Sequence, residues 1–162
     1  MQAESVVVGG GCFWGVEELF RNLPGVLETD VGYCGGISAN PTYKEVSTGQ
    51  TGHAEAVKIT FNPEQITLDR LFDFFFRIHD PTTENRQGND VGTQYRSVIF
   101  VSDESQQRAA AAAKARAQES GRWKKPVVTE IVTAKPFYKA EEYHQDYLVK
   151  YPEGYTCHYI RD

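Results

Sequence analysis

The chain has few cysteines and no long apolar segment. Its 162 residues include only three cysteines, an odd number that is too small for a disulfide scaffold. No Cys-x-x-Cys or His-x-x-x-His pair occurs, so a structural zinc site is not expected. No apolar run has the length of a transmembrane helix, and residues 1–5 lack the basic and apolar regions of a secretory signal. These absences predict a cytoplasmic protein that is not embedded in a membrane and holds no metal.

The chain also lacks an excess of basic residues. It has 17 Lys and Arg against 22 Asp and Glu, which gives a formal net charge of −5. Phosphate backbones and anionic lipids repel such a chain, so neither a nucleic acid nor a membrane is the expected partner. The hydrophobic fraction of 40% is typical of a globular protein, and no linker or repeat divides the sequence. Residues 1–162 are therefore expected to form a single domain, and nothing demands more than a monomer.

Hydrophobic periodicity predicts alternating strands and helices. Apolar runs and alternating patterns predict strands at 6–8, 29–32, 54–61, 97–101 and 127–132. Helical spacing and capping residues predict helices at 13–22, at 68–78 after the N-cap Thr67, from Ser102 to near Gly121, and at 140–150. The first six elements follow the order strand, helix, strand, strand, helix, strand. This order predicts an α+β, ferredoxin-like α/β plait with two layers, a mixed, mostly antiparallel sheet with helices, and an extra C-terminal helix and coil.

The segment Gly11-Cys12-Phe13-Trp14-Gly15 joins an apolar strand to a predicted helix. Cys12 is therefore expected at a helix N-terminus, where unpaired backbone N–H groups and the helix dipole favour an anion. The thiolate is the nucleophilic form of cysteine, so this position favours a reactive thiol. The alternative is a buried small hydrophobe, as many cysteines are. The glycines and the bulky Phe13 and Trp14 favour the reactive interpretation.

Glu55 lies at the beginning of a predicted strand in which every second residue is apolar. If Val57, Ile59 and Phe61 face the core, Glu55 shares that inward face. Burial of the carboxyl group would raise its pKa, and a carboxyl that keeps its proton near neutral pH can act as a general acid. The alternative is a glutamate at a strand end that simply reaches water.

Two loops carry further polar residues that are candidates for a site. Tyr43 follows Pro41 and Thr42 in a glycine-punctuated loop. Asp90 and Tyr95 lie in a polar run that leads directly into a predicted strand. Loops often carry functional residues, but turn formation by Asp90 and packing of the Tyr95 phenol explain the pattern equally well.

The C-terminal segment supplies aromatic residues and a second candidate thiol. Tyr143, His144 and Tyr147 occur at helical spacing, so Tyr143 and Tyr147 are predicted to share a face, which core packing would also explain. Cys157 lies near the end of the sequence, where chains are mobile unless they are tied down. Cys12 and Cys157 are therefore one candidate pair for a catalytic disulfide.

Taken together, these segments resemble closely the A-type peptide methionine sulfoxide reductases. The resemblance runs from residue 6 to about 158, and many motifs carry it in the same order. They are GCFWG at 11–15, VGY at 31–33, GG at 35–36, PTY at 41–43, TGHAE at 51–55, HDPT at 79–82, NRQGNDVGTQYRS at 85–97, FY at 137–138, AE at 140–141, HQDYL at 144–148 and GY at 154–155.

The resemblance implies reduction of the S-epimer of methionine sulfoxide, free or in proteins, and hence the repair of oxidised proteins under oxidative stress. Cys12 would attack the sulfoxide sulfur. Phe13 and Trp14 would form the apolar wall that holds the methyl group of the substrate, and Tyr147 would line the far side.

The resemblance also implies an acid for the sulfoxide oxygen. Protonated Glu55 would donate to that oxygen, assisted by hydrogen bonds from Tyr43 and Tyr95, because the oxygen is a poor leaving group until it is protonated. Asp90 would orient the polar end of the substrate in the same pocket.

The thiols would then complete an oxidation cycle. Cys12 would become a sulfenic acid and condense with Cys157 to a disulfide, and the partner thioredoxin, an external reductant, would reduce that disulfide. No bound cofactor or metal is implied. Many relatives lack a cysteine at the position of Cys34, and Thr156 here precedes Cys157 in a short tail. These departures favour a relay of two cysteines over one of three.

Two other classes of protein compete with this interpretation. In a papain-like cysteine hydrolase, Cys12 would pair with His144, which follows it by 132 positions. However, no Asn follows His144 to orient the imidazole. A non-catalytic binding module would leave Cys12, Glu55 and Cys157 without a shared purpose.

Overall fold

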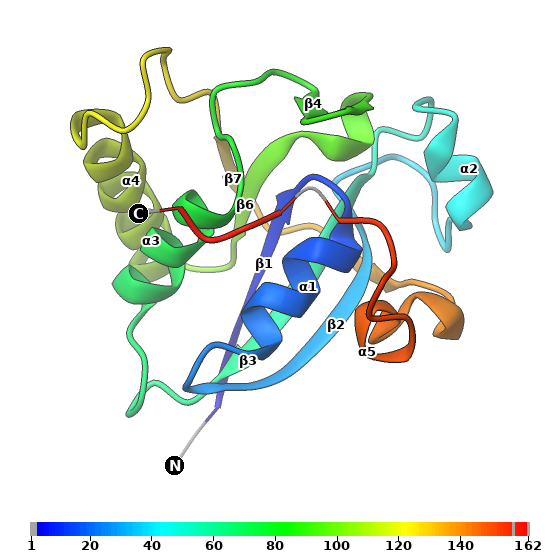
Figure 1. Cartoon of the computed structure of the whole chain (residues 1–162), viewed down its shortest axis with the longest axis horizontal. Coiled ribbons are helices and arrows are strands. Elements are labelled where there is room, and N and C mark those ends of the chain that lie inside the picture. Colours follow the sequence, from blue (N-terminus) through cyan, green and yellow to red (C-terminus); the bar gives the residue numbers. More distant parts are fainter. Residues whose placement is uncertain (1–2, 157, 162) are drawn as a thin grey trace.

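The computed structural model describes residues 3–156 and 158–161, which are built around a six-stranded sheet (Figure 1). The strands follow the order β7-β6-β1-β3-β2-β8 across this sheet. Their bounds are β1 (Glu4–Gly10), β2 (Val26–Cys34), β3 (Ala54–Phe61), β6 (Ser97–Val101), β7 (Glu130–Thr133) and β8 (Phe137–Lys139). A separate small sheet consists of β4 (Arg86–Gln87) and β5 (Asp90–Val91).

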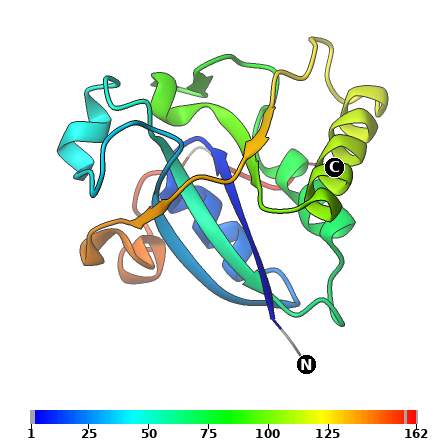
Figure 2. The same cartoon turned by 180° about the vertical axis from the view of Figure 1, so that it is seen from behind.

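Helices connect the strands and cover the sheet. The α-helices are α1 (Phe13–Arg21), α2 (Tyr43–Ser47), α3 (Leu68–Ile78), α4 (Glu104–Glu119) and α5 (Tyr147–Lys150), and the 3₁₀ helices are η1 (Thr93–Tyr95) and η2 (Glu142–His144). Figure 1 shows α1 in front of the sheet, whereas Figure 2 shows the strands from the opposite side. Within the described ranges, no helix combines the length and apolar character that crossing a membrane requires.

Antiparallel pairing predominates in the sheet. β1 pairs with β3 and β6, and β2 pairs with β3 and β8, all antiparallel, whereas β6 and β7 run parallel. The protein is therefore a mixed sheet with helices, as the sequence predicted at this level. Tyr33 of β2 lies opposite Glu55 of β3. A Cβ added to Gly9 would lie 3.0 Å from the carbonyl oxygen of Glu55, so the end of β1 passes close beside the start of β3.

Apolar side chains of α1 and α3 pack on the sheet to form the main core. Each helix places its large residues at helical spacing, so one face of each is buried. The buried members are Phe13, Val16 and Phe20 of α1 and Leu71, Phe72, Phe74, Phe75, Phe76 and Ile78 of α3. The rings of Phe20 and Phe74 meet edge to face with their centroids 5.2 Å apart. This packing fixes α1, and with it the position of its N-terminus.

Several predicted elements agree with the structure. The predicted strands at 54–61 and 97–101 and the predicted helix at 68–78 have the observed bounds of β3, β6 and α3. Thr67 is the N-cap of α3, and its hydroxyl accepts the backbone N–H of Arg70 at 3.2 Å. These segments form as predicted because each carries its own periodic apolar face.

Other predictions were wrong in their bounds. Asp103, not Ser102, caps α4, because the Asp103 carboxylate accepts the backbone N–H of Gln106 at 2.8 Å. The Ser102 hydroxyl instead donates to Gln106 Oε1. The last strand of the predicted set begins at Glu130 as β7 and not at Val127, and α2 and β8 were not predicted at all.

The predicted continuous helix at 140–150 is also wrong. The segment consists of η2 and α5, which Asp146 separates with a left-handed φ of 53°. Gln145 turns toward the sheet: its Oε1 accepts the Val31 N–H at 2.9 Å, and its Nε2 donates to the Val31 carbonyl oxygen at 2.9 Å. These side-chain bonds attach the segment to β2, while the Gln145 backbone N–H donates to the Glu142 carbonyl oxygen at 3.0 Å. Tyr143 is consequently 56% exposed and does not share a face with Tyr147.

Candidate active site

Cys12 occupies the turn between β1 and α1. It is the N-cap residue of α1, and its side chain is only 7% exposed. Gly11 before it has a φ of 99°, a conformation that residues other than glycine rarely adopt. A Cβ on Gly11 would also lie 2.6 Å from Cγ of Gln87. The glycine therefore allows the chain to turn tightly and places Cys12 at the helix N-terminus, as the sequence predicted.

Glu55 is held directly beside this turn. It is 1% exposed, and its Oε1 accepts the backbone N–H of Phe13 at 3.2 Å. Its Oε2 has no hydrogen-bond partner among residues 3–156 and 158–161. Burial raises the pKa of Glu55 to about 8; the bond from Phe13 opposes this shift, and the negative charge of Asp90 adds to it. The carboxyl group is therefore largely protonated at neutral pH, with one oxygen available as a donor.

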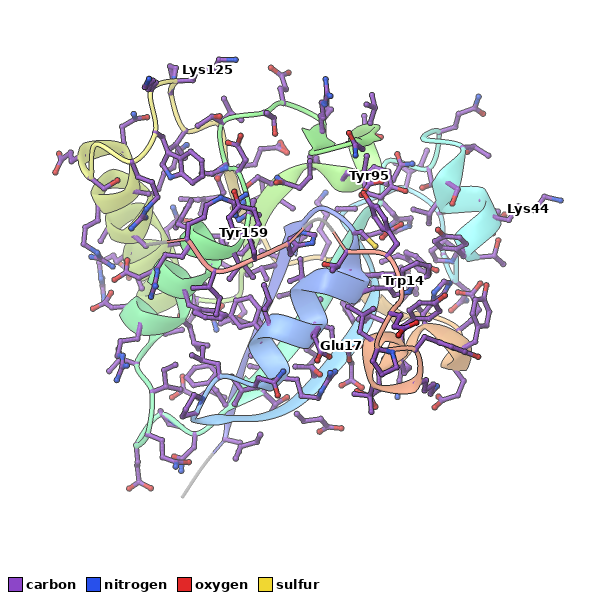
Figure 3. All side chains as sticks on the ribbon, viewed as in Figure 1. Trp14, Glu17, Lys44, Tyr95, Lys125 and Tyr159 are labelled. Carbon is purple, nitrogen blue, oxygen red and sulfur yellow. The ribbon has the colours of Figure 1, made fainter. Side chains whose placement is uncertain are left out.

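Two tyrosines lie within electrostatic reach of this carboxyl group. Tyr43 is the first residue of α2, and Tyr95 is the last residue of η1. Burial and the negative charges of Glu55 and Cys12 raise the pKa of Tyr43 to about 12. Burial, Glu55 and Tyr43 raise the pKa of Tyr95 as well. Both phenols therefore keep their protons as donors, and Figure 3 shows Tyr95 and Trp14 near the same end of α1.

An aromatic cluster forms the other side of the turn. The rings of Trp14 and Tyr147 are stacked, with centroids 3.8 Å apart and planes within 7°. Nε1 of Trp14 donates to Nδ1 of His144 at 3.0 Å. The Phe13 ring lies 5.1 Å from the His144 ring and 6.4 Å from that of Tyr43. Phe13 and Trp14 thus present apolar surface directly beside Cys12.

Glu141 was not identified as a site residue from the sequence, and the structure gives it a positioning role. Its Oε2 accepts the backbone N–H of Tyr43 at 2.9 Å, and its Oε1 accepts the hydroxyl of Tyr33 at 2.8 Å. Burial alone would raise the pKa of Glu141, but the hydrogen bonds it accepts from Tyr43 and Tyr33 prevail and lower the pKa. The carboxylate therefore stays charged and fixes the start of α2. No periodic pattern marks this residue, because its partners lie about 100 positions away.

Asp90 reaches the same region from β5. Its Oδ2 accepts the hydroxyl of Tyr155 at 3.2 Å. Its charge also acts on Glu55 and Tyr95, whose pKa values it helps to raise. Asp90 is therefore coupled to the buried carboxyl group, and Tyr155 is a further residue that the sequence did not single out.

Cys157 lies outside the described residues. Its two neighbours in the sequence pack against α1: a Cβ on Gly15 would lie 2.6 Å from Oγ1 of Thr156 and 2.3 Å from Nδ1 of His158. Nε2 of His158 also donates to the carbonyl oxygen of Gly10 at 2.6 Å. The chain on both sides of position 157 is thus seated on the turn that carries Cys12.

Cys34 lies at the end of β2 and is fully buried. Its thiol donates to the carbonyl oxygen of Lys135 at 3.5 Å. Burial raises the pKa of Cys34, so this thiol is protonated and poorly nucleophilic.

His144 does not form the pair that a cysteine hydrolase requires. Its Nδ1 accepts the Trp14 N–H, and its Nε2 has no hydrogen-bond partner, Cys12 included, in the described part of the chain. Burial lowers the pKa of His144, so the ring stays neutral. The imidazole is a packing residue between Trp14 and Tyr43 rather than a base for Cys12.

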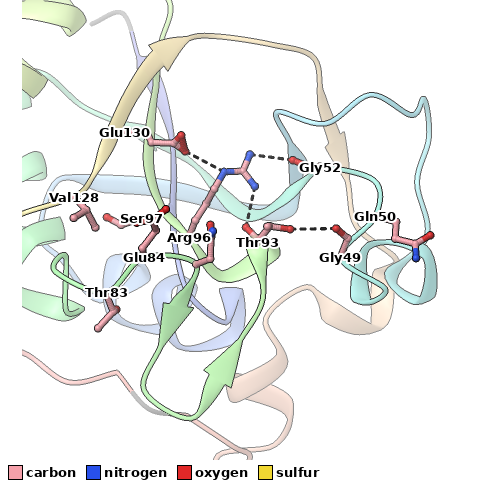
Figure 4. A pocket seen from close by; sticks show the side chains of 11 residues that line it. Gly49, Gln50, Gly52, Thr83, Glu84, Thr93, Arg96, Ser97, Val128 and Glu130 are labelled. Carbon is pink, nitrogen blue, oxygen red and sulfur yellow. Dashed lines mark hydrogen bonds and ion pairs between the residues drawn. The ribbon is translucent and has the colours of Figure 1, made fainter.

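A separate cavity of about 690 Å³ lies beside η1 and is lined by Thr93 and Arg96 among others (Figure 4). Arg96 spans it, donating to the carbonyl oxygens of Gly52 at 3.0 Å and Thr93 at 2.9 Å and pairing with Glu130 at 3.3 Å. Neither Cys12 nor Glu55 lines this cavity. The bonds of Arg96 and of Thr93, whose hydroxyl donates to the Gly49 carbonyl oxygen at 3.3 Å, connect the loop before β3 with η1.

Comparisons with known proteins point to one family. A family model described as peptide methionine sulfoxide reductase matches residues 4–162. A protein of Methanothermobacter thermautotrophicus named peptide methionine sulfoxide reductase MsrA is 54% identical over 158 residues, which cover 98% of this chain and 93% of the relative. The Nocardia farcinica protein of the same name is 52% identical over 155 residues, 96% of this chain and 89% of the relative.

Solved structures agree with these relatives. The reduced form of Mxr1 from Saccharomyces cerevisiae has a TM-score of 0.94 and 42% identity, covering 99% of this chain and 93% of that chain. A structure of Mxr1 in complex with Trx2 has a TM-score of 0.69 and 30% identity, covering 99% of this chain and 91% of that chain. The likeness therefore extends over the whole described fold.

The buried Glu55 carboxyl group makes the free energy of unfolding depend on pH. Because its pKa is higher in the folded chain than in the unfolded chain, its stabilising contribution is present at low pH and is lost as pH rises toward 8. The Glu55→Gln variant lacks this loss. Between pH 5 and pH 8, its free energy of unfolding should therefore gain about 3 kcal/mol on that of the wild type. Urea unfolding at both pH values measures the difference, and exposed Glu119→Gln is the control. A constant difference between Glu55→Gln and wild type would contradict the assigned pKa.

Proposed function

The chain belongs to the peptide methionine sulfoxide reductase family, and we propose that it reduces the S-epimer of methionine sulfoxide, free or in proteins, to methionine. One observation carries the chemistry: a buried, protonated carboxyl group accepts the N–H of the residue that follows Cys12. The proton donor Glu55 is thereby attached to the peptide unit that joins Cys12, which carries the nucleophilic sulfur, to Phe13.

The first step oxidises Cys12. Its sulfur attacks the sulfoxide sulfur while Glu55 gives a proton to the sulfoxide oxygen and recovers one from the thiol. This attack joins the two sulfur atoms. The hydroxyl group then passes from the substrate sulfur to the Cys12 sulfur, so the S–O bond of the substrate breaks and an S–O bond forms on Cys12. The sulfur–sulfur bond breaks with its electron pair going to methionine, which leaves, and Cys12 is left as a sulfenic acid. Cys12 is oxidised by two electrons, and the substrate is reduced by two.

The surrounding groups favour this step for electrostatic and steric reasons. Tyr43 and Tyr95 keep their protons and are proposed to donate hydrogen bonds to the sulfoxide oxygen as charge develops on it. Phe13 and Trp14 are proposed to hold the methyl group, and Tyr147, whose ring stacks on that of Trp14, is proposed to line the far side. Asp90 is proposed to orient the polar end of the substrate.

The second step regenerates the thiol. Cys157 condenses with the Cys12 sulfenic acid, which forms a disulfide and releases water, and the dithiol of thioredoxin then reduces the disulfide by thiol exchange. The packing of Thr156 and His158 on Gly15 supports this pairing, because it brings both neighbours of position 157 to the Cys12 helix. The structure of the related Mxr1 in complex with Trx2 supports thioredoxin as the partner.

We also propose the finer description of the fold and context. The strand order β6-β1-β3-β2 with antiparallel neighbours supports a ferredoxin-like plait for the first six long elements, in a single catalytic domain spanning 1–162. A monomer in the cytoplasm, with thioredoxin as the external reductant and no bound cofactor, is consistent with a thiol cycle that needs a reducing compartment.

The proposed reaction predicts the fate of a racemic substrate. Reduced protein incubated with racemic methionine sulfoxide and no reductant should lose two thiols and release one methionine per chain. Only the S-epimer should be consumed. Thiol titration and chiral chromatography measure both quantities, and a protein that loses no thiol would not be this enzyme.

The acid role of Glu55 predicts a pH dependence. The protonated form is the active one, so the single-turnover rate of methionine formation should fall as pH rises through about 8. Glu55→Ala should lower this rate about 100-fold, with the largest deficit between pH 6 and 8, where the wild type still holds the proton. Stopped-flow measurement from pH 6 to 9 tests this, with Glu119→Gln as the control. An unchanged rate in Glu55→Ala would remove Glu55 from the acid role.

The relay predicts that Cys157 is needed for recycling but not for the first turnover. Cys157→Ser should release one methionine per chain and then stop, even with thioredoxin, its reductase and NADPH present. Cys34→Ala should cycle like the wild type, because Cys34 is buried and protonated. Full multiple turnover in Cys157→Ser would overturn the relay, and loss of turnover in Cys34→Ala would give Cys34 a part in it.

A further inference from the structure

Three aromatic rings in contact, the first two stacked and the third tilted, lead away from the Cys12 turn. The ring centroids of Trp14 and Tyr147 are 3.8 Å apart, and those of Tyr147 and Tyr151 are 4.9 Å apart. We call these residues the aromatic ladder. Trp14 lies immediately beside the catalytic turn, whereas Tyr151 is 57% exposed at the end of α5. The ladder is therefore a continuous aromatic surface that runs from the proposed methyl-binding wall to the outside of the molecule.

The outer end of the ladder opens into a groove. This α5 groove has a volume of about 540 Å³ and is lined by Tyr147, Lys150, Tyr151, Pro152, Glu153 and Gly154. Its shape is fixed by backbone bonds at 2.8 Å, from the Gly154 N–H to the Tyr151 carbonyl oxygen and from the Tyr151 N–H to that of Tyr147. A Cβ on Gly154 would lie 3.0 Å from Cε2 of Tyr147, so the glycine lets the turn approach the ring.

We propose that the α5 groove binds an apolar side chain of the oxidised peptide, two positions away from the methionine sulfoxide. This inference rests on the proposed function, because it requires the methionine sulfoxide to lie against Trp14. Side chains at positions i and i+2 of an extended chain point to the same side and lie about 7 Å apart. The centroid separations from Trp14 to Tyr147 and from Tyr147 to Tyr151 together cover a comparable distance. Tyr147 both stacks on Trp14 of the proposed methyl site and lines the α5 groove.

The chemistry of the lining favours an apolar side chain over a charged one. The two tyrosine rings and Pro152 supply the apolar wall, and Lys150 and Glu153 carry opposite charges at its edge. Nζ of Lys150 is already bonded to the carbonyl oxygen of Glu142 at 3.2 Å. The groove therefore offers no net charge for a charged residue to pair with, but it offers aromatic surface that an apolar residue would bury.

Matched peptides test the proposal in the single-turnover reaction, which does not depend on recycling. Three acetylated and amidated pentapeptides carry methionine sulfoxide at the centre: one with Leu at both outer positions, one with Leu at both inner positions, and one with Gly throughout. The wild type should reduce the outer-Leu peptide about five- to tenfold faster than the Gly peptide at low concentration. In Tyr151→Ala this ratio should fall to about one.

The variant Tyr159→Ala is the matched control, because Tyr159 is also an exposed tyrosine, 59% exposed, and lies away from the ladder (Figure 3). It should keep the wild-type ratio and reduce N-acetyl-methionine sulfoxide at the wild-type rate. Equal wild-type rates for the outer-Leu and Gly peptides, or an unchanged ratio in Tyr151→Ala, would overturn the proposal that the α5 groove binds this side chain. Equal stimulation by inner and outer Leu would overturn the two-position spacing. Failure of the wild type to reduce N-acetyl-methionine sulfoxide would instead refute the proposed function.

Discussion

The bond between the Phe13 N–H and the Glu55 carboxyl group is the constraint on which the rest of the site depends. It joins the first turn of α1 to the start of β3, which adjoin only because β1 and β3 pair along the sheet. The close passage of Gly9 beside Glu55 and the positive φ of Gly11 make that approach sterically allowed. Burial of the carboxyl group then keeps it protonated. The proximity of the thiol-bearing turn and its proposed acid is thus a direct consequence of strand pairing.

A second constraint is the irregular segment from Glu141 to Tyr147. Glu141 fixes the start of α2, and Gln145 pairs with β2 as an extra strand residue would. The Asp146 N–H donates to the Glu17 carboxyl group of α1 at 2.9 Å, and Tyr147 then stacks on Trp14. Polar groups of one short segment, two side chains and one backbone N–H, therefore hold three separate elements around the site. Such bracing gives the aromatic ladder its fixed geometry and connects the catalytic turn with the molecular surface.

The sequence-based predictions were accurate where a segment's own pattern decides its structure and wrong where long-range bonds decide it. The elements β3, β6 and α3 were predicted with their observed bounds, because their own apolar patterns decide which face is buried. The burial of Glu55 followed from the same pattern. The segment at 140–150 was predicted as one helix, because its residues have helical spacing, but long-range bonds of Gln145 and Asp146 break it. Tyr43, Tyr95 and Asp90 were candidates from their loops, but their roles came from the family resemblance, since no local pattern separates them from turn and packing residues.

The sequence by itself determined that Cys12 begins a helix, that Glu55 faces the core, and that the motifs are those of peptide methionine sulfoxide reductases. These features depend on neighbouring residues and their periodicity. Only the tertiary structure decided that Glu55 meets the residue after Cys12, that Glu141 holds Tyr43, and that Tyr147 and Tyr151 extend the Trp14 wall into a groove. The physical reason is that the bonds of Glu55 to Phe13 and of Glu141 to Tyr43, and the stacking of Tyr147 on Trp14, join residues 42, 98 and 133 positions apart. Such contacts leave no periodic trace in the sequence, because each is formed by the way the sheet and helices pack.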